Sequence, residues 1–229
     1  MTKLNLCCGS NVFPGWLNVD RTDLEQDYLR HLREAPPGFV WPPDQQRVAD
    51  ALLAGQLEFM RHDVRKGLPW PDGSVDAIYI GQAIEHFNRG TEAPQLLKEC
   101  WRVLKSGAVI RLTTPSLGGL VASFIESIIE SNEGRPGMRV FAREQPAFYA
   151  NALPEDQLSY LMFGAMGPDC TAEDYEGHFH LYTRRSLAAL LLECGYAAVI
   201  TESNQPDRRF SDTLDKGMSH SFAIEAVKP

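Results

Sequence analysis

The chain has 229 residues, of which 44% are hydrophobic and 23% charged, a composition typical of a folded globular protein. Its net charge of -8 repels nucleic acid phosphates and anionic lipid surfaces, so neither is an expected partner. The N-terminus does not read as a signal peptide and no stretch approaches the ~20 apolar residues of a membrane span, so we expect one cytoplasmic domain over residues 1–229 with reduced thiols.

Short apolar runs alternate with helical periodicity along the chain, and this alternation predicts βα units. The first two runs are predicted strands at 4–6 and 16–19; the first leads into a glycine-containing turn and the second ends at Asp20. Residues 21–58 contain two Pro-Pro pairs, which interrupt any long helix. We therefore expect an irregular insertion there, with room for one short helix.

The middle of the chain predicts a strand, a helix and a second strand. Residues 75–80 have the apolar density of a strand that is buried on both faces. An apolar stripe at helical spacing follows over 96–104, and Gly107 is placed to end that helix. The chain would then enter a strand at 109–113.

The last part of the chain begins with a wide apolar helical stripe and continues as a segment with scattered aromatic residues. We expect this segment, about 116–180, to form a partly helical lid. Thr183 can cap a further helix, and strands are expected at 197–201 and 221–227. The order of elements predicts an α/β fold with a doubly wound, mostly parallel sheet.

A glycine-containing turn after the first strand and an acid after the second are how such a sheet builds a nucleoside site. A dinucleotide site requires Gly-x-Gly-x-x-Gly before a helix, but residues 7–12 contain only Gly9, and a Pro-Gly pair follows. A nucleotide-dependent oxidoreductase is therefore disfavoured. S-Adenosylmethionine needs a close backbone approach, a carboxylate for two ribose hydroxyls and a polar partner for its adenine, which Gly9, Asp20 and Asp63 can provide.

Several sequence blocks occur in a characteristic order. They are LNLCCGS (4–10) with GWLNVD (15–20), HDV (62–64) with LPWPDGSVDAIY (68–79), AIEHF (83–87), ECWRVLKSG (99–107) and, more weakly, residues 187–196. Together they resemble the class I S-adenosylmethionine-dependent methyltransferases, in particular small bacterial members. The resemblance implies a Rossmann-like fold and S-adenosylmethionine as cofactor. Cys7 stands where the family usually has its first glycine, and it would be strained if its φ is positive.

The resemblance and the expected sheet edge together give a set of cofactor-binding candidates. Gly9 would lie under the methionine part, Asp20 at the ribose and Asp63 near the adenine amine, while Gly81 and Gln82 would contribute backbone contacts. The full set is Cys7, Cys8, Gly9, Ser10, Asp20, Arg21, Asp63, Val64, Gly81 and Gln82.

Catalysis needs little from the protein, because the methyl group of a sulfonium is already activated and alignment supplies much of the acceleration. An acceptor hydroxyl could still lose its proton to a histidine, and the catalytic candidates are His86, His180 and Tyr182. His86 could instead be a helix-start residue bonded to the backbone. His178 and His180 alternate and could begin a metal site, but no acid lies at ligand spacing, so no metal is predicted.

The expected acceptor is a small molecule or glycan that is methylated on oxygen or nitrogen, since the acidic charge balance argues against nucleic acid. The aromatic residues of 116–180 could wall its pocket or only seal the segment onto the core. A second possibility is a non-catalytic protein that keeps the fold and acts as a partner or regulatory subunit. Cys7 is the residue that favours this alternative.

Overall fold

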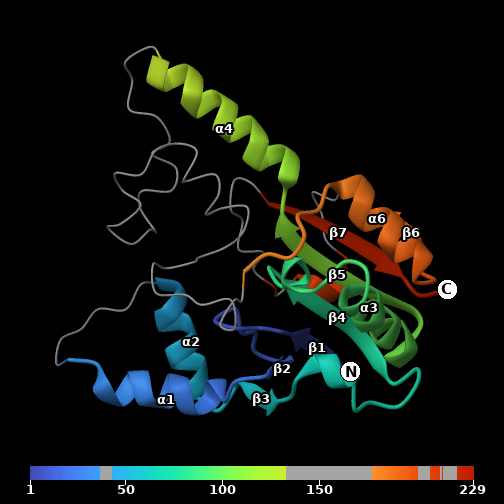
Figure 1. Cartoon of the computed structure of the whole chain (residues 1–229). Helices are drawn as coiled ribbons and strands as arrows, with labels where there is room; N and C mark the ends of the chain where they lie inside the picture. Colours follow the sequence, from blue (N-terminus) through green and yellow to red (C-terminus); the bar gives the residue numbers. More distant parts are fainter. Residues whose placement is uncertain (37–42, 133–176, 201–206, 212, 214–220) are drawn as a thin grey trace.

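The computed structural model describes residues 1–36, 43–132, 177–200, 207–211, 213 and 221–229. Among these residues, seven strands form one sheet in the order β3-β2-β1-β4-β5-β7-β6 (Figure 1). The strands are β1 (Lys3–Leu6), β2 (Leu17–Asp20), β3 (Glu58–Arg61), β4 (Val75–Gly81), β5 (Leu104–Pro115), β6 (Ala197–Ile200) and β7 (Ser221–Val227). The α-helices are α1 (Leu24–Glu34), α2 (Pro43–Leu53), α3 (Glu92–Val103), α4 (Leu117–Asn132) and α6 (Arg184–Glu193). Short 3-10 turns are η1 (Val64–Lys66), η2 (Ile84–His86) and η3 (Arg208–Phe210).

The sheet is mostly parallel, as predicted. Strands β1 to β5 pair in parallel, whereas β7 runs antiparallel to both β5 and β6. The strand order reverses between β1 and β4, and a doubly wound sheet opens its ligand crevice at the carboxyl ends of the strands at such a point.

One face of the sheet is covered by α3 and α6, which lie on the same side of it in Figure 1. Their buried leucines belong to the same core cluster as Ile78 and Ile80 of β4. Thr183 begins α6 with a reciprocal capping box, as its sequence position predicts. Helix α3 ends at Val103 and β5 starts at the next residue, so Gly107 lies inside the strand's span with φ of +72° and does not end the helix.

The opposite face is covered near β1 and β4 by aromatic side chains, because no helix forms between β1 and β2. The rings of Phe13 and Tyr79 meet edge-on with centroids 5.2 Å apart, and those of Trp16 and Phe210 are 5.7 Å apart. The buried amide of Asn18 accepts from Phe13 N at 2.9 Å and donates to Phe13 O at 3.1 Å. These contacts fix the short connection over residues 7–16.

The prediction of an irregular insertion at 21–58 is wrong for its described parts, which hold α1, α2 and the edge strand β3. Asp23 caps α1 by accepting from Gln26 N, and Pro43 begins α2, where a missing N–H costs nothing. The expected short helix is present as α2, whose Val48 packs against the turn that follows β1.

The expected lid begins with α4, which starts directly after β5 and extends away from the sheet (Figure 1). The remainder of that expectation, over 133–176, lies outside the described residues. Within the described part of the chain, no helix is both long and apolar enough to cross a membrane.

Candidate functional site

A cavity of about 400 Å³ lies at the carboxyl ends of β1, β2, β3 and β4, within the usual size range of small-molecule sites. Eight of the residues predicted for the site line it: Cys7, Gly9, Asp20, Arg21, Asp63, Val64, Gln82 and His86. Phe179 also lines the cavity and is one of the aromatic residues of 116–180 that could wall the acceptor pocket; sequence reasoning did not assign the other lining residues, which are Thr22, His62, Arg65, Ala83 and Phe87. The sheet edge therefore gathers most of the predicted cofactor candidates around one space.

Five predicted residues lie elsewhere. The Cys8 side chain is buried against α2, and Ser10 is exposed in the turn. A Cβ on Gly81 would come within 2.6 Å of the Tyr79 ring, so close packing explains this glycine without a ligand. His180 and Tyr182 contact each other, with ring centroids 4.6 Å apart, and Tyr182 is fully buried in the core. The structure thus places neither of these two on the cavity wall.

The turn after β1 is tied to the acid at the end of β2. Asp20 Oδ2 accepts a hydrogen bond from Gly9 N at 3.0 Å, and Oδ1 accepts from Thr22 N at 3.1 Å and Thr22 Oγ1 at 3.0 Å. A carboxylate has about four lone-pair sites, so Asp20 keeps capacity for further donors. A Cβ on Gly9 would meet no protein atom within 4 Å, which leaves open space beside this backbone.

Cys7 has φ of +53°, a left-handed conformation that an L side chain rarely adopts. The predicted strain at this position is therefore present. Burial raises the pKa of the Cys7 thiol to about 12, so the thiol stays protonated at neutral pH. The small, neutral side chain of Cys7 therefore lines the cavity at the position where the family usually has a glycine.

The wall beside β3 combines polar and apolar groups. Asp63 caps η1 by accepting from Arg65 N at 3.1 Å, and the neighbouring Val64 is buried. The Arg65 guanidinium lies 4.6 Å from the centre of the Phe87 ring and forms an ion pair with Glu92 at 2.9 Å. A flat heteroaromatic ring would find an acceptor and apolar surface on this wall.

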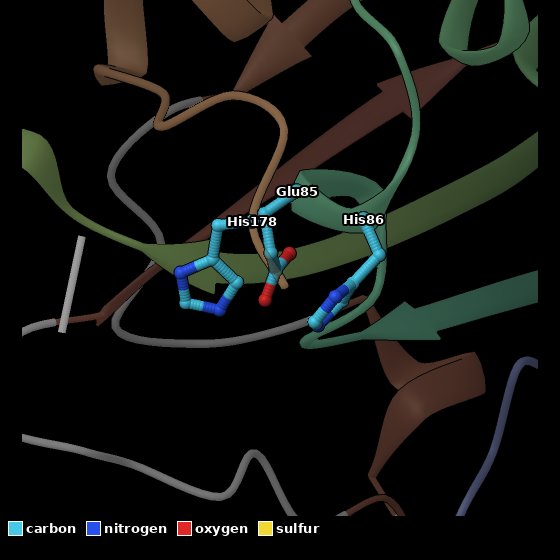
Figure 2. A group of neighbouring side chains, drawn as sticks. All are labelled: Glu85, His86 and His178. Atoms are coloured by element: carbon cyan, nitrogen blue, oxygen red, sulfur yellow. The ribbon is translucent and has the colours of Figure 1, made fainter. Parts of the chain in front are cut away.

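A cluster of three ionisable side chains lies beside the cavity at η2. Figure 2 shows the Glu85 carboxylate between the imidazoles of His86 and His178. One ligand atom from each of the three lies within 4.8 Å of the others, and the two rings have centroids 4.9 Å apart. His86 is the member of this cluster that lines the cavity.

Backbone hydrogen bonds hold the cluster together. The Glu85 carbonyl accepts from Phe179 N at 2.8 Å and from His180 N at 3.2 Å, which fixes the segment that carries His178. The His86 ring lies with Nδ1 3.2 Å from Gly177 O, and a carbonyl can only accept, so Nδ1 carries the proton. The His86 ring bonds the backbone, as one of the two interpretations from the sequence expected, and it also borders the cavity; its catalytic role stays a prediction.

Glu85 has the most perturbed carboxyl group near the cavity. Its side chain is buried, Oε2 accepts from Thr114 Oγ1 at 2.9 Å, and burial raises its pKa to about 7. Burial also lowers the pKa of His86, which favours the neutral imidazole. The sequence did not single out Glu85, because the acid that lies beside His178 comes from an element far away in the chain.

The comparisons with known proteins agree with this geometry. A family model described as a methyltransferase domain matches residues 40–112. A Mycolicibacterium smegmatis protein described as a probable S-adenosylmethionine-dependent methyltransferase is 40% identical over 65 residues. Over part of its length the chain is thus similar to S-adenosylmethionine-dependent methyltransferases. The predicted resemblance, enzyme class and cofactor are those named for the proteins it matches.

The chain is also similar to a solved structure. An S-adenosylmethionine-dependent methyltransferase from Methanosarcina mazei aligns over 99% of this chain and 92% of its own, with a TM-score of 0.50 and 17% identity. This likeness supports the predicted Rossmann-like class I methyltransferase fold. The 65-residue segment that matches the M. smegmatis protein is 27% of this chain and 24% of the length of that protein.

Proposed function

We propose that this chain transfers a methyl group from S-adenosylmethionine to an oxygen or nitrogen atom of a small molecule or glycan. The observation that carries the proposal is the Asp20 carboxylate on the wall of the cavity, bonded to the Gly9 amide at 3.0 Å. A doubly wound sheet binds a nucleoside with this arrangement: a hydrogen-bond acceptor at the end of β2 lies beside a glycine turn that follows β1.

The residues of the cavity fit this cofactor. Asp20 keeps a lone-pair site for a ribose hydroxyl, and the open space beside Gly9 admits the methionine part close to the backbone. Asp63 can accept from the adenine amine while Val64 and Phe87 offer apolar contact to the ring. S-Adenosylmethionine supplies an activated methyl group when bound.

The acceptor would approach from the side of η2, where His86 and Phe179 border the cavity. A lone pair of the acceptor attacks the methyl carbon as the carbon–sulfur bond breaks, and the bonding electrons stay on sulfur. The contribution of the protein is alignment of the two reactants and exclusion of water. We assign the choice of acceptor to residues 116–180, of which α4 and 177–180 are described.

Two measurements test the proposal. Calorimetry should detect binding of S-adenosylhomocysteine and no comparable binding of NAD. Incubation with isotopically labelled S-adenosylmethionine and extract from the source cells should give a labelled small molecule or glycan by mass spectrometry. Absence of S-adenosylhomocysteine binding would refute the proposal.

A second candidate function is a partner or regulatory subunit that binds the cofactor without transferring its methyl group. Cys7 favours it, because a strained side chain replaces a glycine on the cavity wall. This candidate predicts S-adenosylhomocysteine binding with no labelled product, even after Cys7→Gly. A labelled product from the unmodified chain excludes it.

A further inference from the structure

The three side chains at η2 have the composition of a metal site. Glu85, His86 and His178 bring one carboxylate and two imidazoles to one point, with a ligand atom of each within 4.8 Å of the others (Figure 2). Two histidines and a glutamate are a known donor set for catalytic zinc, which keeps a further coordination position open. We propose that this cluster binds a divalent transition-metal cation such as Zn²⁺ at the acceptor side of the cavity.

Hydrogen bonds orient two of the three side chains of the cluster. His86 donates from Nδ1 to Gly177 O at 3.2 Å, so Nε2 is the ring nitrogen that carries the lone pair. Glu85 Oε2 is held by Thr114 Oγ1 at 2.9 Å. A backbone carbonyl on the histidine and a hydroxyl on the carboxylate are the outer partners that usually orient metal ligands.

A buried oxygen atom of Glu85 without a hydrogen-bond partner in the described part of the chain also indicates a ligand at the cluster. The residue is 1% exposed, and its Oε1 has no hydrogen-bond partner among the described residues. A buried acceptor atom that makes no bond costs free energy, and a buried carboxylate costs more unless a positive charge compensates it. Within the described part of the chain, Glu85 forms no ion pair, so a bound cation would satisfy both needs.

The distances require only a small closure. Ligand atoms about 2.1 Å from a tetrahedral cation lie roughly 3.4 Å apart, so atoms separated by up to 4.8 Å would move by about 1.5 Å at most. His86 and His178 are only partly buried, which leaves room for rotation of their rings. The bonds from Phe179 N and His180 N to the Glu85 carbonyl keep the two segments together during this closure.

The cation would have a direct part in the reaction, and this step rests on the function proposed above. Three protein ligands leave positions for one or two acceptor oxygens, as a sugar with neighbouring hydroxyls offers. A hydroxyl bound to the cation loses its proton to solvent water more readily. Its oxygen lone pair then attacks the methyl carbon, the carbon–sulfur bond breaks, and S-adenosylhomocysteine and a methyl ether result with no change of oxidation state.

Metal binding is tested on the full chain after treatment with a chelator. Titration with Zn²⁺ against a chromophoric chelator should show one equivalent with a Kd in the micromolar range or below. His178→Ala and His86→Ala should each weaken this affinity by about 100-fold, since removal of even an outer partner costs roughly 10–100-fold. The matched controls are His180→Ala, two residues from His178, and His31→Ala on the exposed face of α1. Both should keep the wild-type affinity.

A spectroscopic measurement identifies the ligands. Co²⁺ in place of Zn²⁺ should give the visible absorption of a four- or five-coordinate site, and His178→Ala should abolish it. Glu85→Gln should reduce the Zn²⁺ affinity as well; if this buried variant does not fold, the half-buried His178 carries the test alone.

Three outcomes separate this inference from the proposed function. Zn²⁺ affinity that is unchanged by His178→Ala overturns the metal site. Methyl transfer that needs His86 in protein containing no bound metal also overturns it, because His86 then acts as a metal-free base. Zn²⁺ binding at the cluster without any S-adenosylhomocysteine binding supports the metal site and refutes methyl transfer.

Discussion

Replacement of Asp20 tests the cofactor site most directly. The carboxylate already accepts from Gly9 N, Thr22 N and Thr22 Oγ1, and a ribose hydroxyl would add a further bond. Hydrogen bonds to a charged group contribute about 1.5–3 kcal/mol. Asp20→Ala should therefore weaken S-adenosylhomocysteine binding by roughly 10- to 100-fold, since each 1.4 kcal/mol changes Kd tenfold.

The same bonds make part of this effect structural. Loss of the Asp20 carboxylate also frees the Gly9 amide, so the turn after β1 loses its tie to β2. Asp20→Asn separates the two effects because its one acceptor oxygen can keep the bond to Gly9 N while the charge is removed. We expect it to retain the wild-type Tm within a few degrees and to bind S-adenosylhomocysteine at least about tenfold more weakly.

The assay is isothermal titration calorimetry with S-adenosylhomocysteine, accompanied by thermal unfolding of each variant. Asp23→Ala is the matched control, because Asp23 caps α1 three residues away and does not line the cavity. It should lower Tm through loss of the cap and leave the affinity unchanged. If Asp20→Asn and Asp23→Ala bind the ligand equally well, Asp20 does not contact the cofactor.

Three further predictions concern stability. Cys7→Gly should remove the strain of a φ of +53° and raise the free energy of unfolding by roughly 0.5–1 kcal/mol, measured by urea denaturation; a decrease would show that the thiol's packing outweighs the strain. Arg111→Met should cost about 3–5 kcal/mol in the same assay, because the buried Glu225 loses the cation 2.5 Å away. Adding Glu225→Gln should recover part of that loss, and no recovery would argue against a charge effect. Arg102 and the Leu68 amide lower the pKa of Glu99 to about 2, so this carboxyl stabilises the fold above its ordinary pKa of 4.5 and loses that contribution as the pH falls toward 2. Glu99→Gln should flatten the decline of Tm between about pH 5 and pH 2, and an unchanged slope would contradict the assignment.

The fold could be predicted because its central strands are buried on both faces and read as continuous apolar runs. The predicted strand at 75–80 is β4 within one residue. Strand β3 escaped prediction since its outer residues, Glu58 and Arg61, are exposed at the edge of the sheet. Helix α1 was not predicted either, because none of its residues is buried and most of them are polar or charged.

The cofactor candidates could be predicted because chain order alone brings the carboxyl ends of β1, β2 and β4 to one edge. The direction in which each side chain points could not be predicted in this way. Tyr182 points into the core because its backbone pairs with Ser116 at the end of β5, a contact that no local pattern specifies. The pairing of Glu85 with His178 has the same origin, since it depends on how the segment after residue 176 returns to η2.

The short connection between β1 and β2 determines whether the site is ordered during folding or only when a ligand binds. Its backbone is held by the buried amide of Asn18, which bonds Phe13 on one side and the Glu58 carbonyl on the other. Gly9 and Asp20, at the two ends of this brace, are therefore ordered before any ligand arrives. A preorganised site loses little conformational entropy on binding. The strain at Cys7 is then a cost of folding, borne by the empty protein and the loaded one alike, and it leaves the affinity for the cofactor undiminished.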